Sequence, residues 1–217
     1  MKNVLALLIL VLSFTGILNA QDSKYVDAMK KNIAMMDSLR TMDNMKDLTN
    51  SFLRIANAEK DKWLPYYYAS YLYVITSYSD TVKSKKDVYL DEADKAIKMA
   101  DSLKPNESEI YVLQGMISQA RMQEDPMNRY MIYLEKMNGN FNKALALDPT
   151  NPRPEYLMGM TTFYTPEQFG GGAEAAKPVF ASSLKKFNEF IPKNELMPKW
   201  GKNSLEAFLK QNNLLQK

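Results

Sequence analysis

The chain has 217 residues, of which 46% are hydrophobic and 24% charged, so it is long enough for one sizeable core or a short array of repeats. Its formal net charge is only +3, and its acidic and basic residues are interspersed, which argues against nucleic acid as a partner. It contains neither Cys nor His, which excludes disulfides, thiolate nucleophiles, imidazole bases and the usual zinc ligands.

Residues 1–20 have the pattern of a secretory signal peptide. Lys2 supplies the positive charge, Val4–Leu12 form an unbroken apolar run, and Ala20 is a small residue before a polar segment. The apolar stretch is shorter than the roughly 20 residues of a membrane span, and no basic stop follows it directly. We therefore predict cleavage, export to the periplasm or the extracellular space, and a single mature domain of residues 21–217 with no stable membrane span. An uncleaved anchor is the alternative.

Helical periodicity dominates the mature sequence, with apolar residues three or four positions apart. Proline and glycine stand mainly at the borders of the periodic segments, as helices joined by short loops require. The expected helices cover approximately residues 22–39, 45–56, 63–78, 90–100, 107–121, 127–147, 154–163, 173–190 and 204–215. Residues 80–86 are expected to separate the third helix from the fourth. The sequence contains no credible strand pair with a hairpin turn, so the predicted fold class is all-α.

Two stretches of the sequence repeat each other at a spacing of 44 residues. The positions in register are Ala93, Ile97, Ala100, Pro105 and Gly115 in the first stretch, and Met137, Phe141, Ala144, Pro149 and Gly159 in the second. Met137 departs from the small residue at the first position, and Tyr111 and Tyr156, which lie between the proline and the glycine of each stretch, are 45 residues apart. A small residue lets two antiparallel helices approach closely, and a bulky residue of the partner helix fills the space beside it. We therefore expect Gly115 and Gly159 to lie in matching surroundings.

These positions resemble the tetratricopeptide repeat family, whose second helix carries a small, a bulky and a small residue before a proline. Ala176, Phe180 and Ser183 look like a third copy, and Ala69 is the expected upstream equivalent of the two glycines. The family period is about 34 residues, and armadillo and HEAT arrays have periods nearer the one found here. The resemblance covers roughly residues 60–190. It implies a right-handed superhelix, an α-solenoid of about three to four helix pairs plus a C-terminal helix.

Three groups of residues suggest chemistry, but each has a simpler structural interpretation. Residues 170–172 are all glycine, yet they lack the preceding strand and the Gly-Lys-Ser/Thr of a phosphate loop, which favours a flexible turn. Carboxylates such as Glu107 and Glu109 have no histidine or glycine-flanked serine with them and are interpreted as surface charge. The 15 methionines lie mostly on apolar faces and are interpreted as core residues. We therefore predict no catalytic residue, no metal site and no cofactor.

In a tetratricopeptide array, the first helix of each pair lines the concave surface. Aligning Ala69, Gly115 and Gly159 predicts which side chains face inward. The candidate groove residues are Trp63, Tyr66, Tyr73, Met116, Gln119, Arg153, Tyr156, Met160 and Phe163. Aromatic residues give large contact areas at low entropic cost, although packing between repeats would also explain them. We expect a non-enzymatic, exported scaffold that binds a protein or peptide partner in this groove.

A small-ligand carrier associated with a transport system is the alternative function. Residues 169–174 and 198–201 look like the tail of exported bacterial tetratricopeptide proteins, and one group of these accompanies solute transporters. This second resemblance carries no site residues across to the present chain.

Overall fold

The computed structural model describes residues 22–214, and the predicted signal peptide, residues 1–20, lies outside them. Residues 22–35 are helical and are followed by a short 3-10 turn, η1 (Met36–Ser38). The remaining elements are α2 (Met42–Ala58), α3 (Leu64–Ser79), α4 (Lys83–Leu103), α5 (Ser108–Glu124), α6 (Pro126–Leu147), α7 (Arg153–Tyr164), η2 (Glu167–Phe169), α8 (Ala173–Glu189) and α9 (Lys202–Gln211). The described residues contain no strand, so the predicted all-α class is confirmed.

One predicted loop is wrong, because α4 already begins at Lys83. The sequence predicts a break that includes residues 83–86, because the lysines of this run are followed at once by the acidic residues Asp87, Asp91 and Glu92. The turn itself is shorter. The Asp80 carboxylate accepts a hydrogen bond from the Val82 backbone N–H at 2.8 Å and completes it. Lys86 is then part of the helix and pairs with Glu124 of α5 at 3.0 Å.

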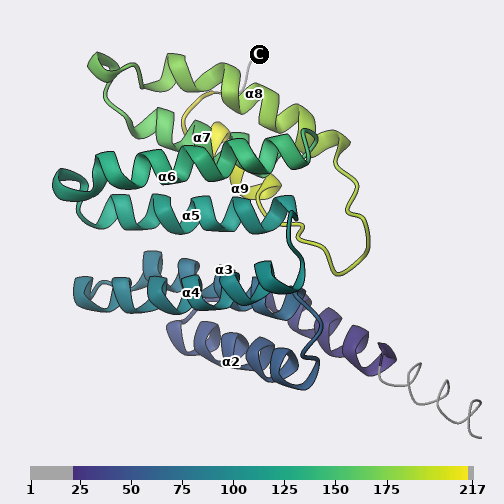
Figure 1. Cartoon of the computed structure of the whole chain (residues 1–217). Helices are drawn as coiled ribbons and strands as arrows, with labels where there is room; N and C mark the ends of the chain where they lie inside the picture. Colours follow the sequence, from purple (N-terminus) through teal and green to yellow (C-terminus); the bar gives the residue numbers. More distant parts are fainter. Residues whose placement is uncertain (1–21, 215–217) are drawn as a thin grey trace, which may run out of the picture.

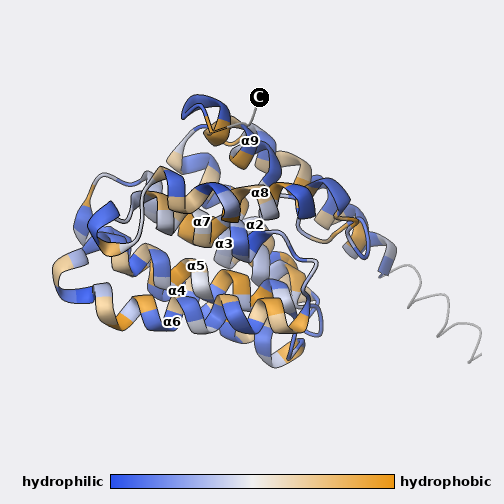
Figure 2. Cartoon of the chain, turned by 90° about the horizontal axis from the view of Figure 1, so that it is seen from above, coloured by the Kyte–Doolittle hydropathy of each residue, from blue (hydrophilic) through white to orange (hydrophobic). Residues whose placement is uncertain are grey.

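Successive helices pack as neighbouring pairs. The most extensive contacts are between α3 and α4, between α5 and α6, and between α7 and α8, with α2 against α3. Figure 1 shows these helices stacked in layers from α2 at one end to α7 and α8 at the other. Figure 2 shows that polar and apolar residues are mixed along each of them, as expected of helices that bury only one face. Among the described residues, no helix has the length and apolar character needed to cross a membrane.

The two repeat glycines lie in matching surroundings. Gly115 of α5 faces the ring of Phe141 of α6, and Gly159 of α7 faces the ring of Phe180 of α8. A Cβ atom added at Gly159 would lie 2.6 Å from the Phe180 ring, and the contact of Gly115 with Phe141 is at least as close. Both phenylalanines are fully buried. The small-against-bulky packing expected from the 44-residue spacing is therefore present in two successive helix pairs.

The segment between α8 and α9, residues 190–201, is called the strap here. It leaves the last helix pair and returns along the stack, and Figure 1 shows it as a long connection at one edge of the molecule. Tyr68 of α3 donates a hydrogen bond to the Leu196 carbonyl at 2.7 Å, so the strap reaches a helix more than 120 residues earlier in the chain. Leu196 and Met197 are buried in the main hydrophobic core. The strap ends at α9, which packs on α7 and α8 in a second, smaller apolar cluster.

Candidate functional site

A cavity of about 600 Å³ lies between the N-terminal helices and the strap. Its volume is in the range of small-ligand pockets, roughly 300–1,000 Å³. The lining residues are Lys30, Ile33, Ala34, Met36, Asp37, Leu39, Met45, Tyr68, Tyr71, Leu72, Ile75, Glu195, Lys199, Trp200, Gly201, Asn203 and Ser204. They come from the first helix and η1, from α2, from α3, and from the strap with the start of α9.

The two walls of this cavity differ in chemistry. The wall formed by the N-terminal helices and α3 is mostly apolar, with side chains such as Ile33, Leu39 and Ile75. The wall formed by the strap and the start of α9 carries the polar residues Glu195, Lys199, Asn203 and Ser204. The cavity is therefore amphipathic, with its apolar side towards the stack of helices and its polar side towards the strap.

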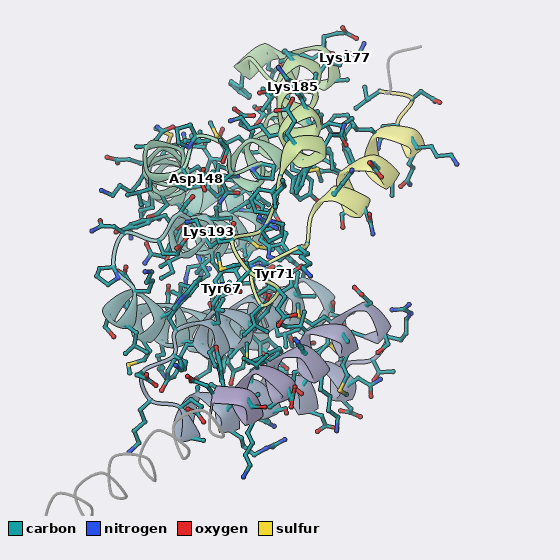
Figure 3. The ribbon with its side chains drawn as sticks, turned by 90° about the vertical axis from the view of Figure 1, so that its right-hand side faces the viewer. Tyr67, Tyr71, Asp148, Lys177, Lys185 and Lys193 are labelled. Carbon is teal, nitrogen blue, oxygen red and sulfur yellow. The ribbon has the colours of Figure 1, made fainter. Side chains whose placement is uncertain are left out.

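Two aromatic rings join the two walls. Tyr71 of α3 stacks on Trp200 of the strap, with ring centroids 4.9 Å apart and planes inclined by 27°. The Trp200 indole N–H donates a hydrogen bond to the Tyr67 hydroxyl at 2.9 Å, which fixes the orientation of the indole. Burial raises the pKa of Tyr71, so its phenol stays neutral at physiological pH. Figure 3 shows Tyr67 and Tyr71 where the strap passes α3. The cavity thus has a rigid, uncharged aromatic surface.

A buried charge holds the strap in place. Arg153 at the start of α7 is completely buried, and its Nη1 contacts Glu109 Oε1 of α5 at 2.8 Å. Its Nη2 donates a hydrogen bond to the Pro198 carbonyl of the strap at 2.5 Å. The Glu109 carboxylate also accepts hydrogen bonds from Asn151 at 2.9 Å and from the Tyr67 hydroxyl at 3.2 Å. Both charges therefore have partners, as burial of charged groups requires.

This network also positions the aromatic wall of the cavity. The Arg153 guanidinium carbon lies 5.1 Å from the Trp200 ring centroid and 4.9 Å from that of Phe190, within the range of cation–π contacts.

Burial raises the pKa of Glu109, while the neighbouring Arg153 opposes that rise. The interpretation of Glu109 and Glu107 as surface charge is therefore wrong, because both are buried.

A second cavity of about 570 Å³ lies on the other side of the strap, between the start of α5, the α6–α7 turn and the end of α8. Its lining mixes lysines with carboxylates, including Lys185, Lys193 and Asp148, which Figure 3 labels. Lys193 faces the buried Glu107 at 3.6 Å. Because Lys193 pairs with Glu107 across it, and because no stacked aromatic pair of the described residues lines it, we regard the first cavity as the candidate site.

None of the nine groove residues expected from the sequence lines the candidate cavity. Met116, Gln119 and Arg153 are buried in the core, and the other six are half-buried. Gln119 joins two helices, because its amide donates hydrogen bonds to the Leu157 carbonyl at 3.1 Å and to Thr161 Oγ1 at 2.7 Å. These three residues therefore hold the fold together and offer no surface to a partner.

The half-buried members of that set pack against neighbouring elements. Met160 and Phe163 of α7 belong to the apolar cluster with α9, and Phe163 meets Phe208 edge-on at 4.9 Å. Tyr156 packs against Phe187 of α8 at 6.3 Å. Trp63, Tyr66 and Tyr73 contact the main core. The return of the C-terminal segment covers part of the surface that the repeat alone would leave open.

The residues that build the cavity carried only weak sequence signals. Tyr71 belongs to the aromatic concentration of residues 63–73, and Ile75 follows it by one helical turn. Trp200 is the only tryptophan outside that concentration and lies in a proline-containing segment that predicts no helix. A tryptophan in a segment without helical periodicity is the sequence signal that could have indicated that the strap packs against the rest of the protein.

The described part of the chain is therefore an all-helical protein with an amphipathic pocket of small-ligand size. Comparison with protein-family models and with curated proteins gives no match. Comparison with solved structures finds a similar protein, the HusA haemophore from Porphyromonas gingivalis, with a TM-score of 0.78 and 28% sequence identity. The similarity covers 89% of this chain and 95% of the haemophore chain.

Proposed function

We propose that this protein is an exported carrier that binds a small, flat and largely apolar ligand of the porphyrin type, with haem as the first candidate. The observation that carries the proposal is the cavity with its Tyr71–Trp200 stack, found in a chain whose fold resembles a haemophore over most of its length. These findings favour the small-ligand carrier over the scaffold for a protein or peptide partner.

The shape and chemistry of the cavity suit a planar aromatic ligand. Aromatic rings attract other rings in offset-stacked arrangements, and Tyr71 and Trp200 offer ring surfaces that are already oriented. Because the chain has no His and no Cys, Tyr and Met are the common haem-iron ligands that it can supply. Tyr71, Met36 and Met45 are the residues of those types that line the cavity together with the buried Tyr68.

The other expectations become parts of the same proposal. The matching glycine–phenylalanine contacts in successive helix pairs support a tetratricopeptide-like array, to which the strap and α9 are added. The predicted signal peptide and the likeness to a haemophore support export, to the periplasm or beyond it. A carrier needs no catalytic group, and we propose that the protein is not an enzyme.

Titration of the mature chain with haem tests the proposal. The chain has two tryptophans, so a Trp63→Phe variant leaves Trp200 as the only indole, and quenching of its fluorescence reports ligand arriving in the cavity. The haem absorption band gives an independent signal. In this background, Tyr71→Ala should weaken binding about tenfold, which corresponds to about 1.4 kcal/mol.

The matched control is Tyr111→Ala, which removes a half-buried tyrosine of α5 that packs beside Lys143 outside the cavity. It should leave the affinity for haem unchanged. Saturable binding that depends on Tyr71 and not on Tyr111 supports the carrier. Absence of saturable binding, or equal loss in both variants, would contradict it.

A further inference from the structure

The charged residues that line the cavity are unevenly paired. Lys30 of the first helix contacts Glu195 of the strap at 2.7 Å, so these two charges offset each other. Lys199 lines the same cavity, is exposed, and makes no ion pair among the described residues. Asp37, the remaining charged lining residue, lies on η1 of the opposite wall, and its carboxylate makes no ion pair among the described residues. Among the described residues, the strap side of the cavity is therefore left with one unpaired positive charge, that of Lys199.

The backbone on either side of Lys199 is held firmly. The carbonyl of Pro198 accepts the hydrogen bond of the buried Arg153. Trp200 is fixed by its stack on Tyr71 and by its hydrogen bond to the Tyr67 hydroxyl. The ammonium group is therefore carried by a flexible side chain on an anchored segment, at the boundary between the cavity and solvent. Such a position suits recognition of an anionic group that projects from an apolar ligand.

We propose that the cavity selects amphipathic carboxylic acids, with the apolar body of the ligand against the wall of α3 and the first helix and a carboxylate bound by Lys199. The inference rests on the proposed function in taking this cavity as the ligand site, and it names the chemical class of the ligand. The polar side chains of Asn203 and Ser204, which line the cavity beside Lys199, lie on the same side and provide further hydrogen-bonding groups.

The test compares ligands that share a ring system and differ in whether they carry free carboxylates. Protoporphyrin IX carries two carboxylates, and its dimethyl ester has the same ring system without them. The wild-type chain should bind the diacid about two- to fivefold more tightly than the ester, the range expected for one solvent-exposed ion pair. Lys199→Gln should lower the affinity for the diacid by a similar factor and leave the affinity for the ester unchanged. The preference for the diacid should also fall as salt is added.

Lys185→Gln is the matched control, because Lys185 is an exposed lysine outside the candidate cavity. It should not alter the preference for the diacid. If diacid and ester bind equally well, or if Lys199→Gln weakens both ligands alike, the role of Lys199 is refuted while the carrier function stands.

A second pair of probes separates this inference from the porphyrin proposal. Anilinonaphthalene sulfonate is an apolar anion, and N-phenyl-1-naphthylamine is its counterpart without the sulfonate. A preference for the anion that Lys199→Gln removes supports anion recognition by Lys199 even if no porphyrin binds. In that case only the porphyrin assignment fails. Equal binding of both probes, unaffected by Lys199→Gln, would overturn the inference in the same experiment.

Discussion

The ion pair between Arg153 and Glu109 leads to a quantitative prediction about what holds the strap. Arg153→Met removes the 2.8 Å contact with Glu109 and the hydrogen bond to the Pro198 carbonyl, while it keeps much of the side-chain volume. Glu109 retains its hydrogen bonds from Asn151 and Tyr67, but its charge stays buried without a counter-ion. Breaking a buried pair in this way costs about 3–5 kcal/mol, so we expect a loss of that size in the free energy of unfolding.

The loss should depend on pH, and its sign follows from Glu109. Burial raises the pKa of Glu109 above its ordinary value of 4.5, and removing Arg153 would raise it further. A carboxyl group with a raised pKa in the folded state contributes stability that is complete below the unfolded pKa and is lost as pH rises through the folded pKa. The deficit of Arg153→Met relative to wild type should therefore be smaller near pH 4.5 and grow towards neutral pH.

A double-mutant cycle separates the charge effect from simple loss of packing. Glu109→Gln alone leaves Arg153 buried without its counter-ion, whereas the double variant with Arg153→Met leaves neither charge. We expect the double variant to be more stable than the sum of the single losses by about 2–3 kcal/mol. Urea unfolding followed by tryptophan fluorescence measures all four proteins. Additivity within about 0.5 kcal/mol, or a deficit that does not change between acid and neutral pH, would refute the reasoning.

Two further predictions concern the helix pairs. Gly159→Ala places a methyl group 2.6 Å from the Phe180 ring and should lower the free energy of unfolding by about 1–3 kcal/mol. The control is Gly139→Ala on α6, where an added Cβ meets nothing within 4 Å, so it should be neutral or stabilising by up to about 1 kcal/mol. Thermal unfolding of both variants compares the two effects. Asp87→Asn should cost about 0.5–1 kcal/mol at neutral pH because it breaks the paired contacts with Arg129, at 2.7 and 2.8 Å. Since Arg129 lowers the pKa of Asp87, this difference from wild type should vanish as pH falls through that lowered pKa, below 3.8; a difference that persists in acid would contradict the assignment.

The helical stack could be predicted because its signals are local in the sequence. Periodicity marks each helix, and the proximity of Gly115 to Phe141 or of Gly159 to Phe180 joins helices that follow each other in the chain. The helix boundaries predicted from the sequence are less accurate than the order of the helices. The C-terminal helix was expected over residues 204–215 but forms over Lys202–Gln211, because Gly201 provides the unusual backbone angle, φ 111°, that starts it two residues earlier.

The site could not be predicted because its contacts span most of the chain. The hydrogen bonds from Tyr68 to Leu196 and from Trp200 to Tyr67 join residues 128 and 133 positions apart. Neither the spacing of the repeat nor the composition of residues 190–201 indicates where that segment lies. The repeat alone predicts an open inner face of α7 with Arg153 on it, although Arg153 is the buried anchor of the strap.

The strap, more than the repeat, gives this protein its cavity, and the Arg153→Met and Gly159→Ala variants together test this distinction. Arg153 does not line the cavity, but it holds Pro198 and faces the Trp200 ring. Arg153→Met should therefore weaken ligand binding by loosening the aromatic wall, under conditions where the chain is still folded. Gly159→Ala lowers stability within a helix pair and touches no cavity residue, so it should leave the affinity unchanged. Equal affinity losses in the two variants would mean that general destabilisation, and not the position of the strap, controls the site.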